Sequence, residues 1–128
     1  MSVTIQNIID ATAEVHGLTL DDLIGPRRHR FIAWPRQQAM YLARKLLPQS
    51  LPWIGRKMGN RDHTTILHGC NAVQARLEWE RGNRKSTKET QSELARIEAL
   101  AVLKAGVVPF KSRRGDGMVF RSVRAVLK

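Results

Sequence analysis

Apolar residues recur every three or four positions along most of the chain, the spacing that places them on one face of an α-helix. The first such run covers residues 3–16. Gly17 predicts its end, because glycine readily adopts the left-handed conformation that closes helices. Thr19 then predicts the cap of a short helical segment over residues 19–23, with two acidic residues in its first turn.

The next amphipathic run follows a break at residues 25–26, which read Gly-Pro. Residues 27–30, Arg-Arg-His-Arg, are therefore expected to form an exposed basic loop. Pro35 suits a first helical position, so a helix is predicted from there to about Leu47, before Pro48. Its inward-facing residues are expected to be Ala39, Leu42, Ala43 and Leu46.

The centre of the chain predicts a short helix, a turn and a longer helix. Ser50 can cap residues 51–58, which Gly59 ends, and the longer helix covers about 62–80. This order is helix-turn-helix organisation. Short polar side chains at the start of the longer helix can reach a DNA groove, and Asp62 can also cap that helix. The inward face of the longer helix is expected to hold Ile66, Cys70, Val73 and Leu77.

The end of the chain changes character after residue 106. Residues 86–89, Ser-Thr-Lys-Glu, match a capping box and predict a last helix to about Gly106. Its inward residues are expected to be Leu94, Ile97, Leu100 and Leu103. Residues 107–128 could form a marginal β-hairpin, with strands over 107–111 and 118–126, or a basic tail. We expect an all-α, compact helical domain over 1–106 and a basic tail or small hairpin over 107–128.

Charge is the most pronounced bulk property of the 128 residues, with a net charge of +11. Residues 1–25 carry four acidic residues and no Lys or Arg, while residues 26–61 carry nine Lys or Arg and no acidic residue. Positive charge is therefore concentrated around the predicted helix-turn-helix. Such a distribution favours a polyanionic partner, above all nucleic acid.

Several other classes of protein do not fit the sequence. Cys70 is the single cysteine, which excludes a disulfide framework and a thiolate zinc cluster. The N-terminal residues show no secretory signal, and no segment reaches the roughly 20 apolar residues of a membrane span. We expect a cytoplasmic, nucleoid-associated protein without membrane contact. Cys70 itself is interpreted as a small core residue.

No catalytic or metal site is predicted. His63 and His68 are five positions apart and do not match the spacing of a helical zinc motif. A nuclease using His63 and Asp62 would need further carboxylates, and no such cluster is visible. The sequence therefore favours a binding protein without cofactors over an enzyme. Trp34, Trp53 and Trp79 are interpreted as packing residues rather than base-stacking platforms.

Four ordered blocks resemble a known family. They read Ile-Ala-Trp-Pro-Arg-Gln over 32–37, Ala-Met-Tyr-Leu-Ala-Arg over 39–44, Ser-Leu-Pro-Trp-Ile-Gly over 50–55, and Gly-Asn-Arg-Asp-His-Thr-Thr-Ile-Leu-His over 59–68. Together they resemble the C-terminal DNA-binding domain, domain IV, of the bacterial replication initiator DnaA. The resemblance covers about residues 3–77 and implies an all-helical, Trp-repressor-like domain that binds duplex DNA at DnaA-box-like sites.

The resemblance also implies roles for individual residues. Those implied to contact bases are Arg28, in the minor groove, and Asp62, His63, Thr64 and Thr65, in the major groove. Those implied to hold the DNA backbone are Arg36, Gln37, Arg44, Leu51, Pro52 and Arg61. The side-chain chemistry fits independently, because a carboxylate can accept from cytosine, threonine methyls can meet thymine methyls, and arginine is attracted to a narrow minor groove.

The sequence departs from the family pattern in places. Asn60 stands where the family usually has a second glycine, and Asn71 and Ala72 stand where basic residues are common. No Gly-x-x-x-x-Gly-Lys-[Ser/Thr] P-loop is present, so the ATPase module of the initiator is not expected. We therefore expect a stand-alone DNA-binding protein that regulates replication initiation or transcription.

A different class of function stays open beside this one. The helical domain could be a protein-interaction module that binds a replication or transcription partner, with only non-specific DNA contact. The intact run Arg-Asp-His-Thr-Thr over 61–65 favours sequence-specific binding, because an interaction module has little use for it.

Overall fold

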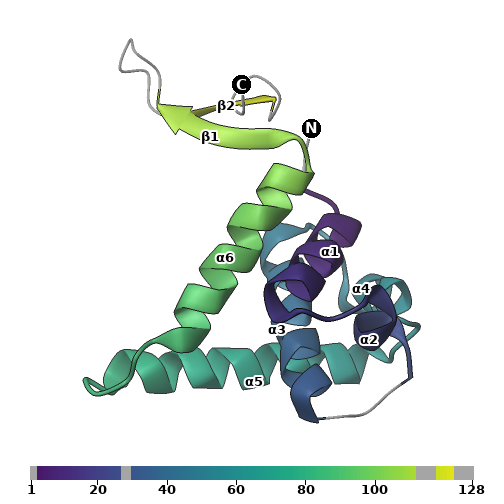
Figure 1. Ribbon diagram of the computed structural model, residues 1–128. Coiled ribbons are helices and arrows are strands. Elements are labelled where there is room, and N and C mark those ends of the chain that lie inside the picture. Colours follow the sequence, from purple (N-terminus) through teal and green to yellow (C-terminus); the bar gives the residue numbers. More distant parts are fainter. Residues whose placement is uncertain (1–2, 27–29, 112–117, 123–128) are drawn as a thin grey trace.

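Six helices followed by a pair of strands make up residues 3–26, 30–111 and 118–122, the part of the chain that this computed structural model describes. The all-α domain with a helix-turn-helix predicted from the sequence is confirmed. Figure 1 shows α6 turning back from one end of α5 while α4 lies near the other end. The elements are α1 (Ile5–His16), α2 (Leu20–Ile24), α3 (Arg30–Leu46), α4 (Leu51–Lys57), α5 (His63–Gly82), α6 (Glu89–Lys104), β1 (Val107–Lys111) and β2 (Met118–Ser122).

Several helix ends lie where the sequence predicts them. Gly17 closes α1 with a φ of +67°. The hydroxyl of Thr19 accepts a hydrogen bond from the N–H of Asp22, 3.1 Å away, and so caps α2. The hydroxyl of Ser50 accepts from the N–H of Trp53 at 3.3 Å and caps α4. Local sequence thus fixes these three boundaries, because each depends on residues within one turn.

The start of α3 corrects one prediction. The helix begins at Arg30, so Pro35 lies buried within it rather than at its first position. A proline at this depth forfeits the hydrogen bond to the carbonyl four residues earlier. The extra turn is favoured by Ile32, which is fully buried in the core. Of the predicted basic loop, Arg30 belongs to α3 and residues 27–29 lie outside the described residues.

The start of α6 corrects a second prediction, because Ser86 does not cap it. The helix follows Lys88, whose φ is +55° and whose side chain makes no capping hydrogen bond. The Ser86 hydroxyl instead accepts from the N–H of Lys88 at 3.1 Å. The N–H of Thr90 donates to both carboxylate oxygens of Glu80, each 3.2 Å away. A carboxylate at the end of α5 therefore serves the first turn of α6.

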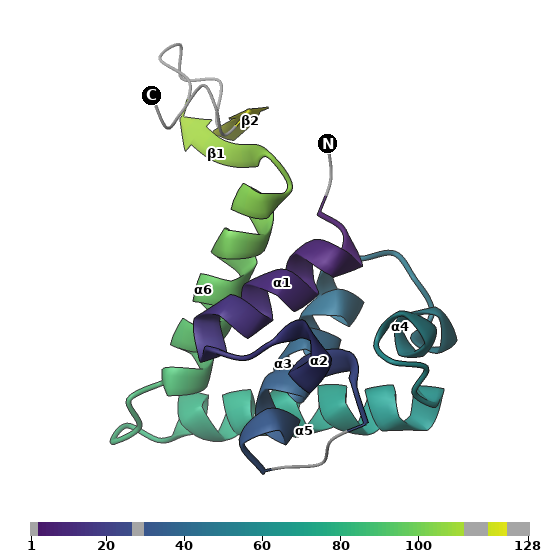
Figure 2. The same cartoon turned by 45° about the vertical axis from the view of Figure 1, so that its right-hand side comes forward.

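The core lies between α1, α3, α5 and α6, with α2 and α4 closing its side. Figure 2 shows α1 crossing α3, with α5 beneath them and α6 along one side. In the last turns of α6, Ala101 is buried while Leu103 is 39% exposed, so the predicted inward position of Leu103 is wrong. Cys70 is buried, as predicted. Fully buried apolar side chains come from all six helices: Ile8, Leu23, Ile32, Leu42, Ile54, Met58, Ile66, Val73 and Ile97.

A buried polar network ties three helices together. Gln38 of α3 is fully buried, and its side-chain oxygen lies 2.5 Å from Nε2 of His16 in α1. The amide nitrogen of Gln38 donates to Glu93 of α6 at 3.3 Å. Nδ1 of His16 also lies 3.8 Å from the Glu93 carboxylate. These contacts fix α6 against α1 and α3.

The segment after α6 forms a hairpin, one of the two alternatives that the sequence allowed. β1 pairs antiparallel with β2, from Val107 opposite Ser122 to Lys111 opposite Met118. β2 ends at Ser122, before the predicted end at residue 126, and residues 123–128 lie outside the described part. Within residues 3–26, 30–111 and 118–122, no helix has both the length and the apolar character that crossing a bilayer requires.

Candidate nucleic-acid interface

The turn between α4 and α5 is tight and depends on two left-handed residues. Gly59 has a φ of +84° and Asn60 a φ of +58°. Asparagine tolerates this conformation, which explains how Asn60 can stand in place of a glycine. The N–H of Arg61 donates to the carbonyl of Gly55 at 2.8 Å, and a Cβ on Gly55 would lie 2.1 Å from the Arg61 carbonyl oxygen. The turn therefore sets α5 against α4 at a contact that only glycine permits.

The run from Asp62 to Thr65 lies at the exposed start of α5. Asp62 caps the helix, since its carboxylate accepts from the N–H of Thr64 at 3.2 Å and from the Thr64 hydroxyl. Nδ1 of His63 lies 3.4 Å from the same carboxylate. All four side chains are exposed to solvent. Short donors, acceptors and methyl groups thus project together from a helix end, as reading a DNA groove requires.

The Asp62 carboxylate is held in its charged form. Hydrogen bonds from the hydroxyl and then the N–H of Thr64 lower its pKa, and the neighbouring His63 acts in the same direction. Desolvation acts in the opposite direction, but the bonds from Thr64 outweigh it and the pKa is lowered. At neutral pH the side chain is therefore an acceptor only.

α5 approaches α3 closely just beyond this run. A Cβ on Gly69 would lie 2.6 Å from the sulfur of Met40, so the glycine lets the two helices touch. The thiol of Cys70 donates to the Met40 carbonyl at 3.5 Å, and burial raises the pKa of that thiol. This close contact fixes the direction in which the first turns of α5 project.

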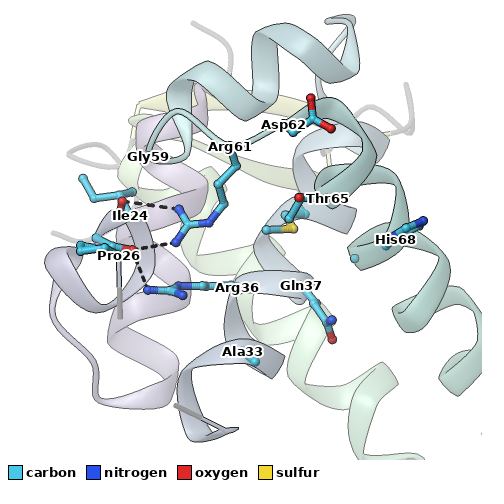
Figure 3. Close-up of a pocket in the computed structure, with 13 residues that line it drawn as sticks. Ile24, Pro26, Ala33, Arg36, Gln37, Gly59, Arg61, Asp62, Thr65 and His68 are labelled. Carbon is cyan, nitrogen blue, oxygen red and sulfur yellow. Dashed lines mark hydrogen bonds between the residues drawn. The ribbon is translucent and has the colours of Figure 1, made fainter. Parts of the chain in front are cut away.

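A shallow cavity of about 760 Å³ opens between the end of α2, the first half of α3 and the first turns of α5. Figure 3 shows Gln37, Thr65 and His68 around it, with Arg36 and Arg61 on the side of α2. Gln37 is half-buried, while Thr65 and His68 are exposed. This cavity therefore brings together five of the residues named from the resemblance: Arg36, Gln37, Arg61, Asp62 and Thr65.

The other residues named from the resemblance that the structure describes differ in exposure. Arg44, on the second half of α3, is exposed, and so is Pro52 near the start of α4. Leu51 is half-buried against the core. Arg28 lies outside the described residues, so its role stays a prediction.

Arg36 and Arg61 differ from Arg44, because their guanidinium groups are engaged with the protein. Arg36 is only 7% exposed and donates to backbone carbonyls at the end of α2. Arg61 is half-buried and donates to carbonyls of the same segment. Burial lowers the pKa of Arg61, and so does the neighbouring charge of Arg36. Spacing along the sequence gave no sign of these contacts.

Outside this surface, the tryptophans need a partial correction. Trp34 and Trp53 pack against the core as predicted, but Trp79 on the far half of α5 is 52% exposed. The guanidinium of Arg76 lies 4.6 Å from the centre of its ring. In the part of the chain that the structure describes, no three His, Cys, Asp or Glu side chains are grouped so as to hold a metal ion.

Comparisons with known proteins agree with the geometry. Residues 5–73, from α1 to the middle of α5, match the family model described as the bacterial dnaA protein helix-turn-helix. The chromosomal replication initiator protein DnaA of Cereibacter sphaeroides (strain ATCC 17029) is 56% identical over 72 residues, which are 56% of this chain and 16% of that protein. The DnaA of Caulobacter vibrioides (strain NA1000) is 51% identical over 73 residues, 57% of this chain and 15% of that protein. The DnaA of Roseobacter denitrificans is 44% identical over 72 residues. The chain spans about a sixth of the length of these relatives. Because the family model covers more than half of the chain, and includes the turn and the start of α5, the chain belongs to the bacterial DnaA helix-turn-helix family.

Proposed function

We propose that this protein binds double-stranded DNA at DnaA-box-like sites and reads their sequence through the start of α5. The observation that carries the proposal is the exposed run from Asp62 to Thr65, called the reading run below. It lies at the start of the second helix of the helix-turn-helix, which Asp62 caps, and within the family match. Reading through a major groove needs short polar side chains that project from a fixed helix end. The tight turn at Gly59 and the close contact at Gly69 supply that fixed end.

The side chains offer chemistry that suits base edges. The ionised Asp62 can accept from the amino group of cytosine, and His63 can donate or accept. Thr64 and Thr65 carry methyl groups that can meet the methyl group of thymine. The hydroxyl of Thr64 bonds to Asp62, which leaves the rest of that side chain available for such a contact.

Other residues would hold the duplex in register. Gln37, Arg44, Leu51 and Pro52 would contact the DNA backbone, which carries little sequence information. For Arg28 the proposal rests on the resemblance alone, which puts it in the minor groove. The resemblance assigns a backbone contact also to Arg36 and Arg61, whose guanidinium groups already bond to protein carbonyls.

The charge distribution supports a DNA partner. Residues 26–61, which run from the end of α2 to the turn before α5, carry nine Lys or Arg and no acidic residue. Such a concentration of positive charge attracts phosphates, and it makes the binding of DNA weaken as the salt concentration rises. The protein would act by occupying sites, either in the initiation of replication, the role named for the relatives, or in transcription from promoters that contain such sites.

A fluorescence anisotropy titration tests the proposal. The dissociation constant is measured for a DnaA-box duplex and for a scrambled duplex of the same composition, at several salt concentrations. We expect tighter binding to the box, and we expect His63→Ala to reduce the preference by about 1–3 kcal/mol. Ser92→Ala is the control, since Ser92 is exposed on α6, outside the helix-turn-helix. Equal affinity of the wild type for both duplexes would refute sequence-specific reading.

One observation favours the alternative of a protein-interaction module. Trp79 is 52% exposed with Arg76 stacked on its ring, and tryptophan and arginine are the residues most often dominant in protein interfaces. Trp79 lies 14 residues along α5 from Thr65, about 21 Å at helical rise. The alternative predicts the equal affinities just described, with a steep salt dependence for both duplexes.

A further inference from the structure

The end of α2 has backbone acceptors that its own helix cannot satisfy. α2 has five residues, so its last carbonyls lack partners further along the helix. Four successive carbonyls, from Asp22 to Gly25, accept hydrogen bonds from the side chains of Arg36 and Arg61. Figure 3 shows both guanidinium groups directed at this segment, between Ile24 and Pro26.

Arg36 reaches the segment from α3. Its Nε donates to the carbonyl of Asp22 at 2.9 Å and to that of Leu23 at 3.1 Å. One terminal nitrogen donates to the carbonyl of Gly25 at 2.8 Å. The side chain is 7% exposed, so these bonds are shielded from water. A guanidinium fits this task because its donors diverge in one plane, which a lysine ammonium cannot reproduce.

Arg61 reaches the same segment from the residue just before the cap of α5. One terminal nitrogen donates to Gly25 at 2.7 Å, so both arginines share this carbonyl. The other donates to the carbonyl of Met58 and, at 3.4 Å, to that of Ile24. Gly59 leaves room for this arrangement, since a Cβ there would lie 2.0 Å from the Ile24 oxygen and 2.5 Å from the Arg61 nitrogen.

These bonds hold the two guanidinium groups in place. Moving either group would release carbonyls at the end of α2, and buried carbonyls left without partners are unfavourable. Arg61 also links α2 to the turn itself through Met58. Its backbone leads directly into Asp62, the cap of α5. The orientation of the reading run therefore depends on where the Arg61 side chain is anchored.

We propose that Arg36 and Arg61 are positioning residues, which fasten the end of α2 to α3 and to the start of α5 through these hydrogen bonds. This inference rests on the proposed function, because what the two arginines position is the DNA-reading run. The basic residues near the helix-turn-helix then have two roles. Arg36 and Arg61 set the orientation of the reading run, and exposed residues such as Arg44 contact the duplex.

Lysine substitutions separate the two roles, because lysine keeps the charge but loses the divergent donors. Dissociation constants for box and scrambled duplexes are measured against salt for Arg36→Lys, Arg61→Lys and the matched control Arg96→Lys. We expect the ratio of the two constants to fall about tenfold in the first two variants, with the salt dependence unchanged. In Arg96→Lys, both the ratio and the affinities should stay within about twofold, since Arg96 is exposed on α6, outside the helix-turn-helix. Thermal unfolding of each variant gives the folded fraction at the assay temperature.

Two results of this titration would overturn the proposal. Unchanged ratios and affinities in Arg36→Lys and Arg61→Lys would mean that these arginines act as interchangeable charges at phosphate. Equal loss of affinity for both duplexes, in proportion to the unfolded fraction, would mean that they only stabilise the fold.

A measurement without DNA keeps the inference separate from the proposed function. Hydrogen exchange is followed at the amides of Gly25, Thr65 and Ile66, which bond to Asp21 and to Asp62 near the anchored contacts. In Arg61→Lys, exchange at these amides should be about tenfold faster relative to the amide of Leu42, a fully buried residue inside α3 that reports global opening. If the wild type shows no preference between duplexes, the proposed function fails and exchange alone decides on positioning. Unchanged exchange at these amides would then refute it.

Discussion

Glu80 joins the end of α5 to the start of α6, and replacing it tests whether one buried carboxylate holds this corner together. The side chain is 2% exposed. It accepts two hydrogen bonds of 3.2 Å from the N–H of Thr90, and Nε of Arg76 lies 3.3 Å from it. Glu80→Gln preserves the size of the side chain but removes its charge and one of its acceptor oxygens. Because hydrogen bonds to a charged group contribute about 1.5–3 kcal/mol, we expect a loss of about 2 kcal/mol in the free energy of unfolding at pH 7.

The dependence of this loss on pH follows from the pKa of Glu80. Burial alone raises that pKa, but hydrogen bonds from Thr90 and Gln91 and the charge of Arg76 outweigh it, and the net direction is downward. The folded pKa thus lies below the unfolded value of about 4.3. The stabilisation is therefore fully present above the unfolded pKa and is lost as the pH falls through the folded one. The gap between wild type and Glu80→Gln should narrow from pH 5 to pH 3.

Urea unfolding at pH 7, 5, 4 and 3 measures this gap directly. Glu89→Gln is the control, because Glu89 is an exposed carboxylate in the first turn of the same helix. Its loss should be small, about 0.5 kcal/mol, as for other exposed charges near a helix start. A gap for Glu80→Gln that is the same at pH 7 and pH 3 would show that the carboxylate does not act through its charge.

Three further outcomes are expected. Gly59→Ala should lower the free energy of unfolding by more than about 2 kcal/mol, because its φ is +84° and the new Cβ would lie 2.0 Å from a carbonyl oxygen; Gly17→Ala, with a φ of +67° and open space around it, should cost about 1 kcal/mol in the same urea titration. Arg44→Ala should weaken binding to box and scrambled duplexes equally and lower the slope of log K against log salt by about 0.9, as measured by anisotropy. A fragment of residues 1–106 should unfold cooperatively near the midpoint of the full chain, whereas a fragment of residues 1–82 should not, since it lacks the buried Leu94, Ile97 and Ala101; calorimetry of both fragments checks this.

Local signals explain what the sequence could predict. The caps at Thr19 and Ser50 depend on an N–H three residues away, so pattern alone located them. Helical spacing likewise placed Cys70 in the core. Contacts between distant segments explain the failures. Glu80 accepts the hydrogen bond at the start of α6 from Thr90, ten residues away, in place of the predicted local cap. The carbonyls at the end of α2 that accept from Arg61 lie 36 and 37 residues before it. No periodicity announces such partners, because they exist only after the helices have packed.

The folding unit is larger than the family match. The match ends at residue 73, in the middle of α5, yet α6 covers α1 and closes the core with Ile97 fully buried. Gln38 joins α1 to α6 from the middle of α3, the helix whose other side meets α5 at Gly69. α6 is therefore connected to the reading run through α3 rather than by direct contact with it. A short, exposed run can keep one orientation only if the helices beneath it are rigid, and in this chain part of that rigidity comes from residues beyond the motif that identifies the family.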